Sequence, residues 1–250
     1  MLQDTILYPL IFLYGIIIGS FLNVCIYRIP RKENITTTRS HCMNCGYSLK
    51  WYDLFPLFSY IFLGGKCRKC KKKISIQYPI IEALNGSLYV LIFLIHGYRL
   101  ESIIYCLFTS ALIVLSVIDF RTYEIPVGIN LFIGVLGSFR TFLDFPHIGQ
   151  YLLGLCSVSG FLLLIYLFTK GRGIGGGDIK LMAASGLVIG FPNIVLAFIL
   201  GCIIGSVIHI LRMRISKEDR VLAFGPYLSI GIFIAMLYGN QIINWYLSFY

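Results

Sequence analysis

The chain has 250 residues, of which 58% are hydrophobic and 13% are charged, and its mean hydropathy is +0.82. Soluble globular domains contain about 25% charged residues, so this composition excludes an ordinary soluble fold and favours a membrane protein. The formal net charge is +10. Because the basic residues have no nucleic-acid recognition module beside them, we expect membrane lipid as their partner and no nucleic acid.

Eight apolar segments have the length and composition expected of membrane-crossing helices. They predict an all-α fold, a polytopic membrane bundle of about eight transmembrane helices. The sixth segment is the least regular, because it is short and ends at Phe191-Pro192. The segments are residues 6–27, 78–95, 101–118, 125–141, 148–168, 179–191, 193–211 and 226–247.

The first segment is too long for a signal peptide, and no Lys or Arg precedes it, so we expect a retained span. The basic residues predict how the spans are oriented. Loop 28–77 and the loops on its side contain 19 of the 21 Lys and Arg residues, and the opposite side has only Arg99 and Arg140. The loops counted with it are 119–124, 170–180 and 212–220. This excess predicts that loop 28–77 faces the cytoplasm.

Loop 28–77 contains two Cys-x-x-Cys pairs, and 21 residues separate them. Two such pairs are typical of a tetrahedral Zn²⁺ site, and the reducing cytoplasm argues against disulfides. Four thiolates leave no open coordination position, so we expect a structural zinc, with a redox-active pair as the alternative. The expected ligands are Cys42, Cys45, Cys67 and Cys70, whereas the cysteines in apolar segments are expected to be packing residues.

Two aspartates occupy unusual positions for a membrane chain. Asp119 ends the apolar run 113–118, and Asp178 follows three consecutive glycines at 175–177. A carboxylate at the centre of a membrane helix costs roughly 2.5–3.5 kcal/mol, so such residues are candidates for function. The structural alternatives are an ion pair of Asp119 with Arg121 and a helix N-cap for Asp178. Glu82 is a third acid within a span, and we expect it to support the site or to pair with a basic residue.

Two neighbouring carboxylates suit peptide hydrolysis. Like charges a few ångströms apart do not ionise together, so the pair holds one proton: one member takes a proton from water and the other hydrogen-bonds the scissile carbonyl. The glycines before Asp178 allow an extended substrate to approach closely. The glycines before Asp178 also resemble those of a nucleotide-binding loop. Such a loop needs a strand before it, but an apolar span precedes the glycines here, so this interpretation is disfavoured. The competing functions are a proton-coupled transporter and a membrane scaffold without catalysis.

The ordered motifs of nearly the whole chain resemble those of type IV prepilin peptidases, which are membrane aspartic proteases of the GxGD type. The motifs are Gly19-Ser20-Phe21-Leu22-Asn23, the four-cysteine insert, Tyr78-Pro79-x-x-Glu82, Asp119 with Ile125-Pro126, Gly175-x-Gly177-Asp178-x-Lys180 and Phe224-Gly225-Pro226. Met43 and Val127 depart from residues common in that family, but neither departure removes a proposed ligand or acid.

The resemblance implies that Asp119 and Asp178 are catalytic, with Gly175, Gly177 and Lys180 as supporting residues. It also implies cleavage of basic leader peptides from prepilins or pseudopilins at the cytoplasmic face of the bacterial inner membrane. Many members then methylate the new N-terminus with S-adenosylmethionine, and no residue here can be assigned to that cofactor. The expected organisation is a first transmembrane helix (1–27), a cytoplasmic zinc-binding loop (28–77) and a transmembrane peptidase domain (78–250).

Overall fold

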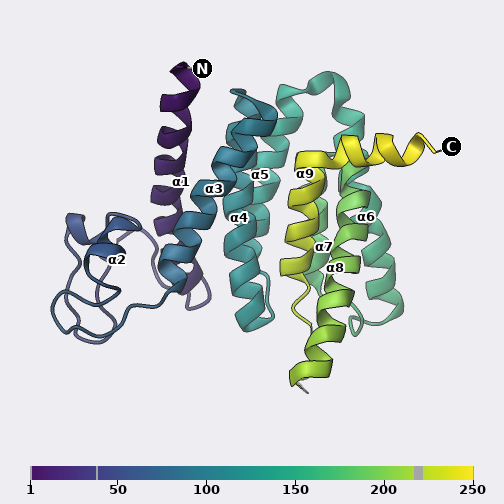
Figure 1. Ribbon diagram of the computed structural model, residues 1–250. Coiled ribbons are helices and arrows are strands. Elements are labelled where there is room, and N and C mark those ends of the chain that lie inside the picture. Colours follow the sequence, from purple (N-terminus) through teal and green to yellow (C-terminus); the bar gives the residue numbers. More distant parts are fainter. Residues whose placement is uncertain (1, 38, 217–221, 250) are drawn as a thin grey trace. The chain divides into compact units, whose positions relative to one another are not determined.

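A computed structural model describes residues 2–37, 39–216 and 222–249 (Figure 1). Within these ranges the regular structure is helical, and the chain forms two compact units, residues 1–114 and 115–250. Six of the described helices are long and apolar enough to cross a membrane. The all-helical membrane fold expected from the sequence is therefore confirmed.

The first unit contains α1 (Leu2–Arg28), α3 (Gln77–His96) and the beginning of α4 (Leu100–Thr122). Helices α1 and α3 pack side by side (Figure 1). A Cβ atom on Gly15 would lie 2.6 Å from the Cα of Gly86, and one on Gly19 would lie 2.7 Å from the Cα of Glu82. The sequence Gly15-x-x-x-Gly19 thus provides the close helix contact expected of small residues in membrane helices.

A buried polar network joins the three helices of this unit. Asn85 donates to the carbonyl of Gly15 at 2.7 Å, and Ser110 donates to the Asn85 side-chain oxygen at 2.9 Å. The hydroxyl of Tyr89 lies 2.9 Å from that of Ser110. Because a polar group without a partner is costly in a bilayer, these bonds fix which faces of α1, α3 and α4 meet.

Between α1 and α3, the chain forms an insert with little regular structure. It contains a 3-10 turn at Trp51–Asp53, helix α2 (Phe58–Phe62) and two isolated β-bridges, His41 with Ser48 and Lys66 with Lys73. Each bridge closes a short loop around one Cys-x-x-Cys pair. The insert therefore consists mainly of two similar cysteine loops with an aromatic segment between them.

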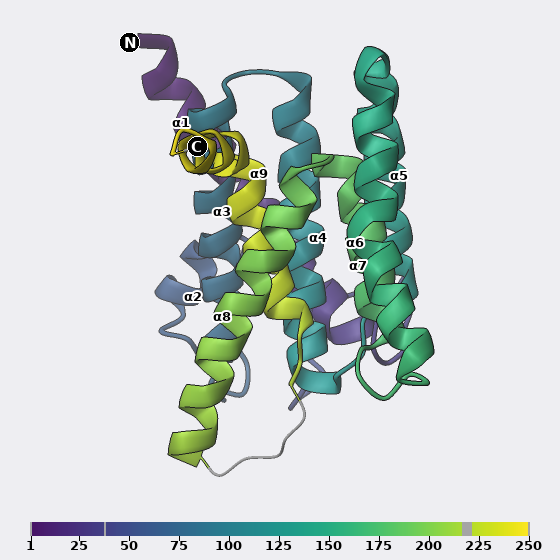
Figure 2. The ribbon, with the colours of Figure 1, turned by 90° about the vertical axis from the view of Figure 1, so that its right-hand side faces the viewer.

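The second unit contains the end of α4 and the remaining helices. Helix α7 packs against α5 and α6, and α8 packs against α9 (Figure 2). Gly201 again marks a close contact, because its Cβ would lie 3.1 Å from the Cα of Leu228 on α9. The bounds are Val127–Leu143 for α5, Ile148–Phe168 for α6, Gly176–Ile189 for α7, Asn193–Ser216 for α8 and Gly225–Leu247 for α9.

All eight predicted segments are helices, but several expected loops are shorter than predicted. Helix α4 continues to Thr122, α7 already begins at Gly176, and α8 continues to Ser216. Of the predicted loop 212–220, residues 217–220 lie outside the described residues. Helices α5 and α7 have 17 and 14 residues, short for a perpendicular span of about 20.

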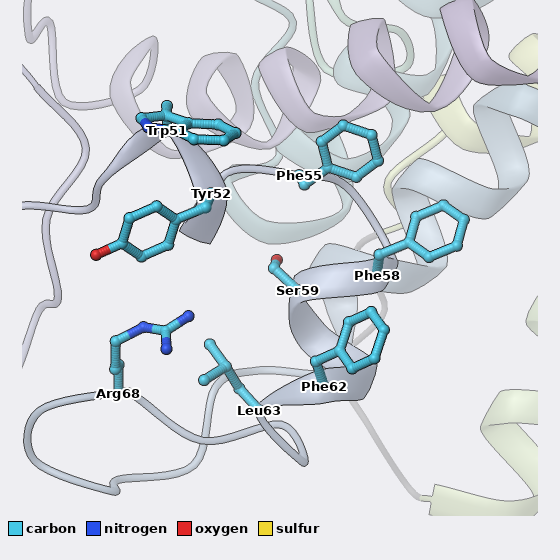
Figure 3. A pocket seen from close by; sticks show the side chains of 8 residues that line it. All are labelled: Trp51, Tyr52, Phe55, Phe58, Ser59, Phe62, Leu63 and Arg68. Atoms are coloured by element: carbon cyan, nitrogen blue, oxygen red, sulfur yellow. The ribbon is translucent and has the colours of Figure 1, made fainter.

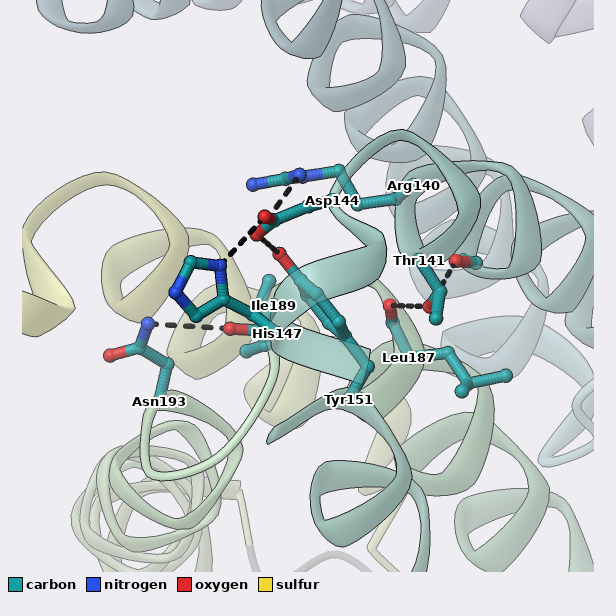
Figure 4. Close-up of polar contacts among 9 residues, drawn as sticks. Arg140, Thr141, Asp144, His147, Tyr151, Leu187, Ile189 and Asn193 are labelled. Carbon is teal, nitrogen blue, oxygen red and sulfur yellow. Dashed lines mark hydrogen bonds and ion pairs between the residues drawn. The ribbon is translucent and has the colours of Figure 1, made fainter. Parts of the chain in front are cut away.

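A polar cluster closes the turn between α5 and α6, at the end of α5 away from Pro126 (Figure 4). The carboxylate of Asp144 accepts a hydrogen bond from Tyr151 at 2.7 Å and contacts His147 Nδ1 at 2.8 Å. Arg140 lies 3.9 Å from the same carboxylate. These contacts bind the first turn of α6 to the last turn of α5, which fixes the turn.

Candidate active site and metal centre

Asp119 lies in the last turn of α4 and is 5% exposed. Its Oδ2 atom accepts a hydrogen bond of 2.9 Å from the backbone N–H of Gly225, the first residue of α9. A Cβ atom on Gly225 would lie 2.7 Å from Oδ2 and 3.1 Å from the Asp119 Cγ. A side chain at this position would therefore displace the carboxylate from the backbone N–H that holds it.

Asp178 lies in the first turn of α7 and is 9% exposed. The N-cap of this helix is Gly175, so the alternative prediction that Asp178 caps it is wrong. The backbone N–H of Asp178 donates to the Gly175 carbonyl at 3.2 Å, and a Cβ on Gly175 would lie 3.1 Å from the Asp178 Oδ2. The carboxylate thus folds back over the glycine loop that precedes the helix.

The structure brings Asp119 and Asp178 together within the second unit. Their carboxylates lie close enough for the charge of one to act on the other. Both are buried, and an apolar environment strengthens such an interaction. Acids 59 positions apart in sequence are therefore brought near one another, one in the last turn of α4 and the other in the first turn of α7.

Helix α5 and the residue Ile125 before it contact Gly177, in the first turn of α7 beside Asp178. Asn130 donates a hydrogen bond of 3.3 Å to the carbonyl of Gly177, and a Cβ on Gly177 would lie 2.9 Å from the Cβ of Ile125. Asn130 is 5% exposed, and its Oδ1 is buried without a hydrogen-bond partner among the described residues. Sequence reasoning missed Asn130, although an amide inside the apolar segment 125–141 could have indicated it. Pro126 is the N-cap of α5.

The other predicted supporting residues differ in their surroundings. Gly175 and Gly177 flank Asp178 as described, whereas the side chain of Lys180 is exposed on α7. Glu82 belongs to the first unit, where it is 6% exposed and accepts the backbone N–H of Leu57 at 2.8 Å. Its role in catalysis stays a prediction.

The four insert cysteines converge into one cluster, whose sulfur atoms all lie within 4.8 Å of one another. The Cys42 and Cys70 sulfurs are 3.9 Å apart, and those of Cys45 and Cys67 are 4.0 Å apart. Four sulfurs at about 2.3 Å from a tetrahedral Zn²⁺ would be separated by about 3.8 Å, so the cluster fits that ion closely.

The two cysteine loops share one backbone pattern. The N–H of Cys42 donates to the carbonyl of Tyr47, and that of Cys67 donates to the carbonyl of Lys72, both at 2.9 Å. The residue after each second cysteine, Gly46 or Lys71, has a positive φ of 68° or 60°. The backbone N–H of Lys72 lowers the pKa of Cys70 to about 6, which favours the thiolate that a metal requires. The cluster can therefore bind a metal ion.

Comparison with known proteins identifies the family of this chain. Residues 13–96 match the model of the bacterial peptidase A24 N-terminal domain, and residues 106–210 match the type IV leader peptidase family. No solved structure matches the chain.

Three curated relatives, each named prepilin leader peptidase/N-methyltransferase, are similar over almost their whole length. The protein of Bacillus subtilis (strain 168) is 35% identical, and the alignment covers 96% of this chain and 97% of the relative. Those of Neisseria gonorrhoeae and Aeromonas hydrophila are 31% and 30% identical, and each alignment covers 96% of this chain and 94% of the relative. With its buried acid pair and four-cysteine insert, the chain belongs to the type IV leader peptidase family.

Proposed function

We propose that Asp119 and Asp178 form the acid/base pair with which this chain hydrolyses the leader peptide bond of type IV prepilins. The chain is a multi-pass membrane enzyme with peptidase and N-methyltransferase activity, as its family and relatives indicate. The observation that carries the assignment of residues is the meeting of the two buried carboxylates in one unit.

Hydrolysis requires one proton to be shared between the two acids. The ionised carboxylate takes a proton from water, whose oxygen then bonds to the carbonyl carbon of the scissile amide. The protonated carboxyl donates its proton to the carbonyl oxygen. When the tetrahedral intermediate collapses, the C–N bond breaks and a proton passes to the leaving amine, which becomes the new N-terminus. The titration belongs to the pair rather than to either residue.

The backbone contacts support this chemistry because they restrict where each carboxylate can lie. The N–H of Gly225 fixes Asp119, and the glycine loop held by Asn130 fixes Asp178. Neither carboxylate depends on a long flexible side chain for its position. Such preorganisation is what orients reacting groups without a further loss of entropy during the reaction.

The location and cofactors form the second part of the proposal. The excess of basic residues in loop 28–77 supports a cytoplasmic position for the insert and for the aspartate site, in a bacterial inner membrane. Sulfur separations near 4 Å support a structural Zn²⁺ held by Cys42, Cys45, Cys67 and Cys70. S-adenosylmethionine would supply the methyl group to the new amine. The organisation into 1–27, 28–77 and a peptidase domain at 78–250 remains part of this proposal.

Cleavage of a prepilin by the purified enzyme in lipid tests the acid pair. Asp119→Asn and Asp178→Asn should each reduce leader removal by about 10²–10⁴-fold, because an amide cannot serve as the acid or base. Mass spectrometry reports the cleaved product and any added methyl group together.

Glu124→Gln is the matched control, because Glu124 is an exposed acid five residues after Asp119. This variant should process the prepilin normally. Metal content and helicity measured on all three variants report intact folding. Full processing by either aspartate variant would refute the pair.

A further inference from the structure

An exposed aromatic surface lies on the segment of the insert that separates the two cysteine loops in sequence, and Figure 3 labels its four aromatic side chains. We define it as the side chains of Trp51, Phe55, Phe58, Ile61 and Phe62. Trp51 is 80% exposed and Phe62 is 85% exposed. Large apolar groups gathered on an exposed surface usually mark a binding site for a protein or a membrane.

The aromatic surface has a hollow with a cation at its edge. Trp51, Phe58 and Phe62 help to line a cavity of about 330 Å³, and the Arg68 guanidinium lies across from the phenylalanines in Figure 3. The same guanidinium lies 5.0 Å from the centre of the Tyr52 ring. Aromatic rings beside a cation are the combination found where proteins meet lipid headgroups and acyl chains.

A buried carboxylate holds this surface in shape. The side chain of Asp53 is 2% exposed and accepts a hydrogen bond of 2.7 Å from Arg68 Nε. The backbone N–H of Lys50 and the hydroxyl of Tyr47 also donate to it, at 3.2 Å and 3.3 Å. The aromatic segment is thereby tied to both cysteine loops, so the surface is formed before any partner binds.

One hydrogen bond sets the depth of the surface relative to a membrane helix. The backbone N–H of Leu57, next to Phe58, donates to Glu82 Oε2 at 2.8 Å. Glu82 lies five residues inside α3, which begins at Gln77, so the contact is about 7–8 Å along that helix at a rise of 1.5 Å per residue. Interfacial segments bury their apolar faces about 5–10 Å deep. The aromatic surface is therefore level with the headgroup and acyl boundary if α3 spans the membrane.

The charge around this segment matches an anionic membrane. Five exposed lysines follow it within twelve residues, and basic residues near an anionic membrane surface are attracted to it. These are Lys66, Lys69, Lys71, Lys72 and Lys73.

We propose that the aromatic surface inserts into the interface of a bilayer that contains anionic lipid, and so holds the metal-binding insert against the membrane. Its rings occupy the boundary between headgroups and acyl chains, and the neighbouring lysines contact the headgroup phosphates. This lipid contact goes beyond leader cleavage and requires no substrate.

The depth of Trp51 tests the proposal directly in the full-length enzyme. Trp51 and Trp245 are the two tryptophans of the chain, so Trp245→Phe leaves Trp51 as the sole tryptophan. The protein is reconstituted into phosphatidylcholine vesicles with and without phosphatidylglycerol. We expect emission at short wavelength, strong quenching by lipids brominated near the headgroup, and several-fold weaker quenching by aqueous acrylamide when phosphatidylglycerol is present.

Two further variants, made in the Trp245→Phe protein, test whether the aromatic side chains hold Trp51 at the membrane. Phe58→Ser combined with Phe62→Ser should return Trp51 to the aqueous phase, so acrylamide quenching rises several-fold. Met43→Ser is the matched control, since Met43 is a 57% exposed apolar residue of the same insert outside the aromatic surface. It should leave the depth of Trp51 unchanged.

Two results would overturn the proposal. One is a Trp51 that acrylamide reaches fully in both kinds of vesicle. The other is protection that begins only when prepilin or S-adenosylmethionine is added to an Asp119→Asn background, since the surface would then bind substrate or cofactor. The fluorescence measurement reports the depth of Trp51 and does not require catalysis. A negative fluorescence result would therefore not contradict the proposed acid pair, and loss of the acid-pair proposal would not change the fluorescence result.

Discussion

The four-cysteine insert and the aspartate site differ in how far apart in sequence their residues lie. The insert collects its four ligands from residues 42–70, with two local loops of nearly identical backbone. The aspartate site joins the end of α4 to the beginnings of α7 and α9, so its parts lie up to 106 positions apart. A local site can be made by a short sequence with a metal, whereas a dispersed one exists only when the helices have packed.

We therefore expect different perturbations to disrupt the structure of the two regions. Few side chains of the insert are buried, so we expect its shape to depend on a bound metal and on the Asp53 contacts. The aspartates are held by main-chain groups of packed helices. Damage to helix contacts should stop catalysis without loss of metal, and loss of metal should loosen the insert without unfolding the helices.

A methyl group at Gly225 should have the largest effect among substitutions that leave both acids in place. In Gly225→Ala, the new Cβ would lie 2.7 Å from Asp119 Oδ2. A displacement of about 1 Å at a reacting group can cost about 10²-fold, so we expect that loss in kcat for prepilin cleavage.

Gly128→Ala provides the control for Gly225→Ala. A Cβ at Gly128 on α5 meets no atom within 4 Å, so the variant should retain its activity and metal. Undiminished cleavage by Gly225→Ala would show that the position of Asp119 does not depend on this contact.

Removal of the metal should release the insert while the helices persist. Structural Zn²⁺ contributes about 10–16 kcal/mol to the folding of small metal domains. After chelation, or in Cys42→Ser combined with Cys67→Ser, trypsin should cut the lysine-rich segment 66–73 much faster, with unchanged helicity by circular dichroism.

The same digestion reports orientation. Cleavage should occur in inverted membrane vesicles and not in sealed right-side-out vesicles, because we place the insert in the cytoplasm. Cys156→Ser, at an exposed cysteine of α6, should behave as the unchanged enzyme. Rapid cleavage of the metal-loaded enzyme would contradict a structural role for the metal.

Asn130→Ala should have a moderate effect on catalysis. Loss of this part-buried hydrogen bond to the Gly177 carbonyl costs about 0.5–1.5 kcal/mol. If the loop beside Asp178 moves as a result, kcat should fall about tenfold. Ser138→Ala, at an exposed serine of the same helix, should leave kcat unchanged. Equal rates for both variants would mean that Asn130 does not position the loop.

The smallest expected effect comes from removing the charge of Asp53, which stabilises the insert at neutral pH. Burial raises the pKa of Asp53, but the bonds from Arg68, Lys50 and Tyr47 outweigh it and hold the pKa below its ordinary value. A carboxylate with a lowered pKa stabilises the fold above its unfolded value of about 3.9, and this stabilisation is lost as pH falls through the folded value. Trypsin sensitivity at neutral pH should therefore rise modestly in Asp53→Asn. Proteolysis equal to that of the unchanged enzyme would show that the charge is not needed.

The sequence predicted the helices and the clustering of the four cysteines more completely than the surroundings of the two aspartates. Apolar length is enough to locate a membrane helix, and Cys-x-x-Cys spacing is enough to locate a ligand pair. Membrane helices are apolar on all faces, so periodicity does not show which face of α5 turns towards Gly177. For that reason Asn130 escaped notice, and the contact of Gly225 with Asp119 was not foreseen.

Helix starts were also harder to predict than helix interiors. Asp178 looked like a possible N-cap because acids favour that position, yet the flexible backbone of Gly175 takes it and leaves Asp178 in the first turn. The exposed rings of residues 51–62 were not anticipated either, because nothing in their spacing distinguishes a surface from a small core.

The glycine contact between α1 and α3 has a consequence for biosynthesis. The insert of residues 28–77 is translated between these two helices, so α1 leaves the ribosome well before its partner. Translation proceeds at about 5–20 residues per second, so several seconds pass between the synthesis of Gly15 and Gly19 and the synthesis of α3. During that interval the ribosome completes both cysteine loops, so metal can load before the first pair of spans has assembled.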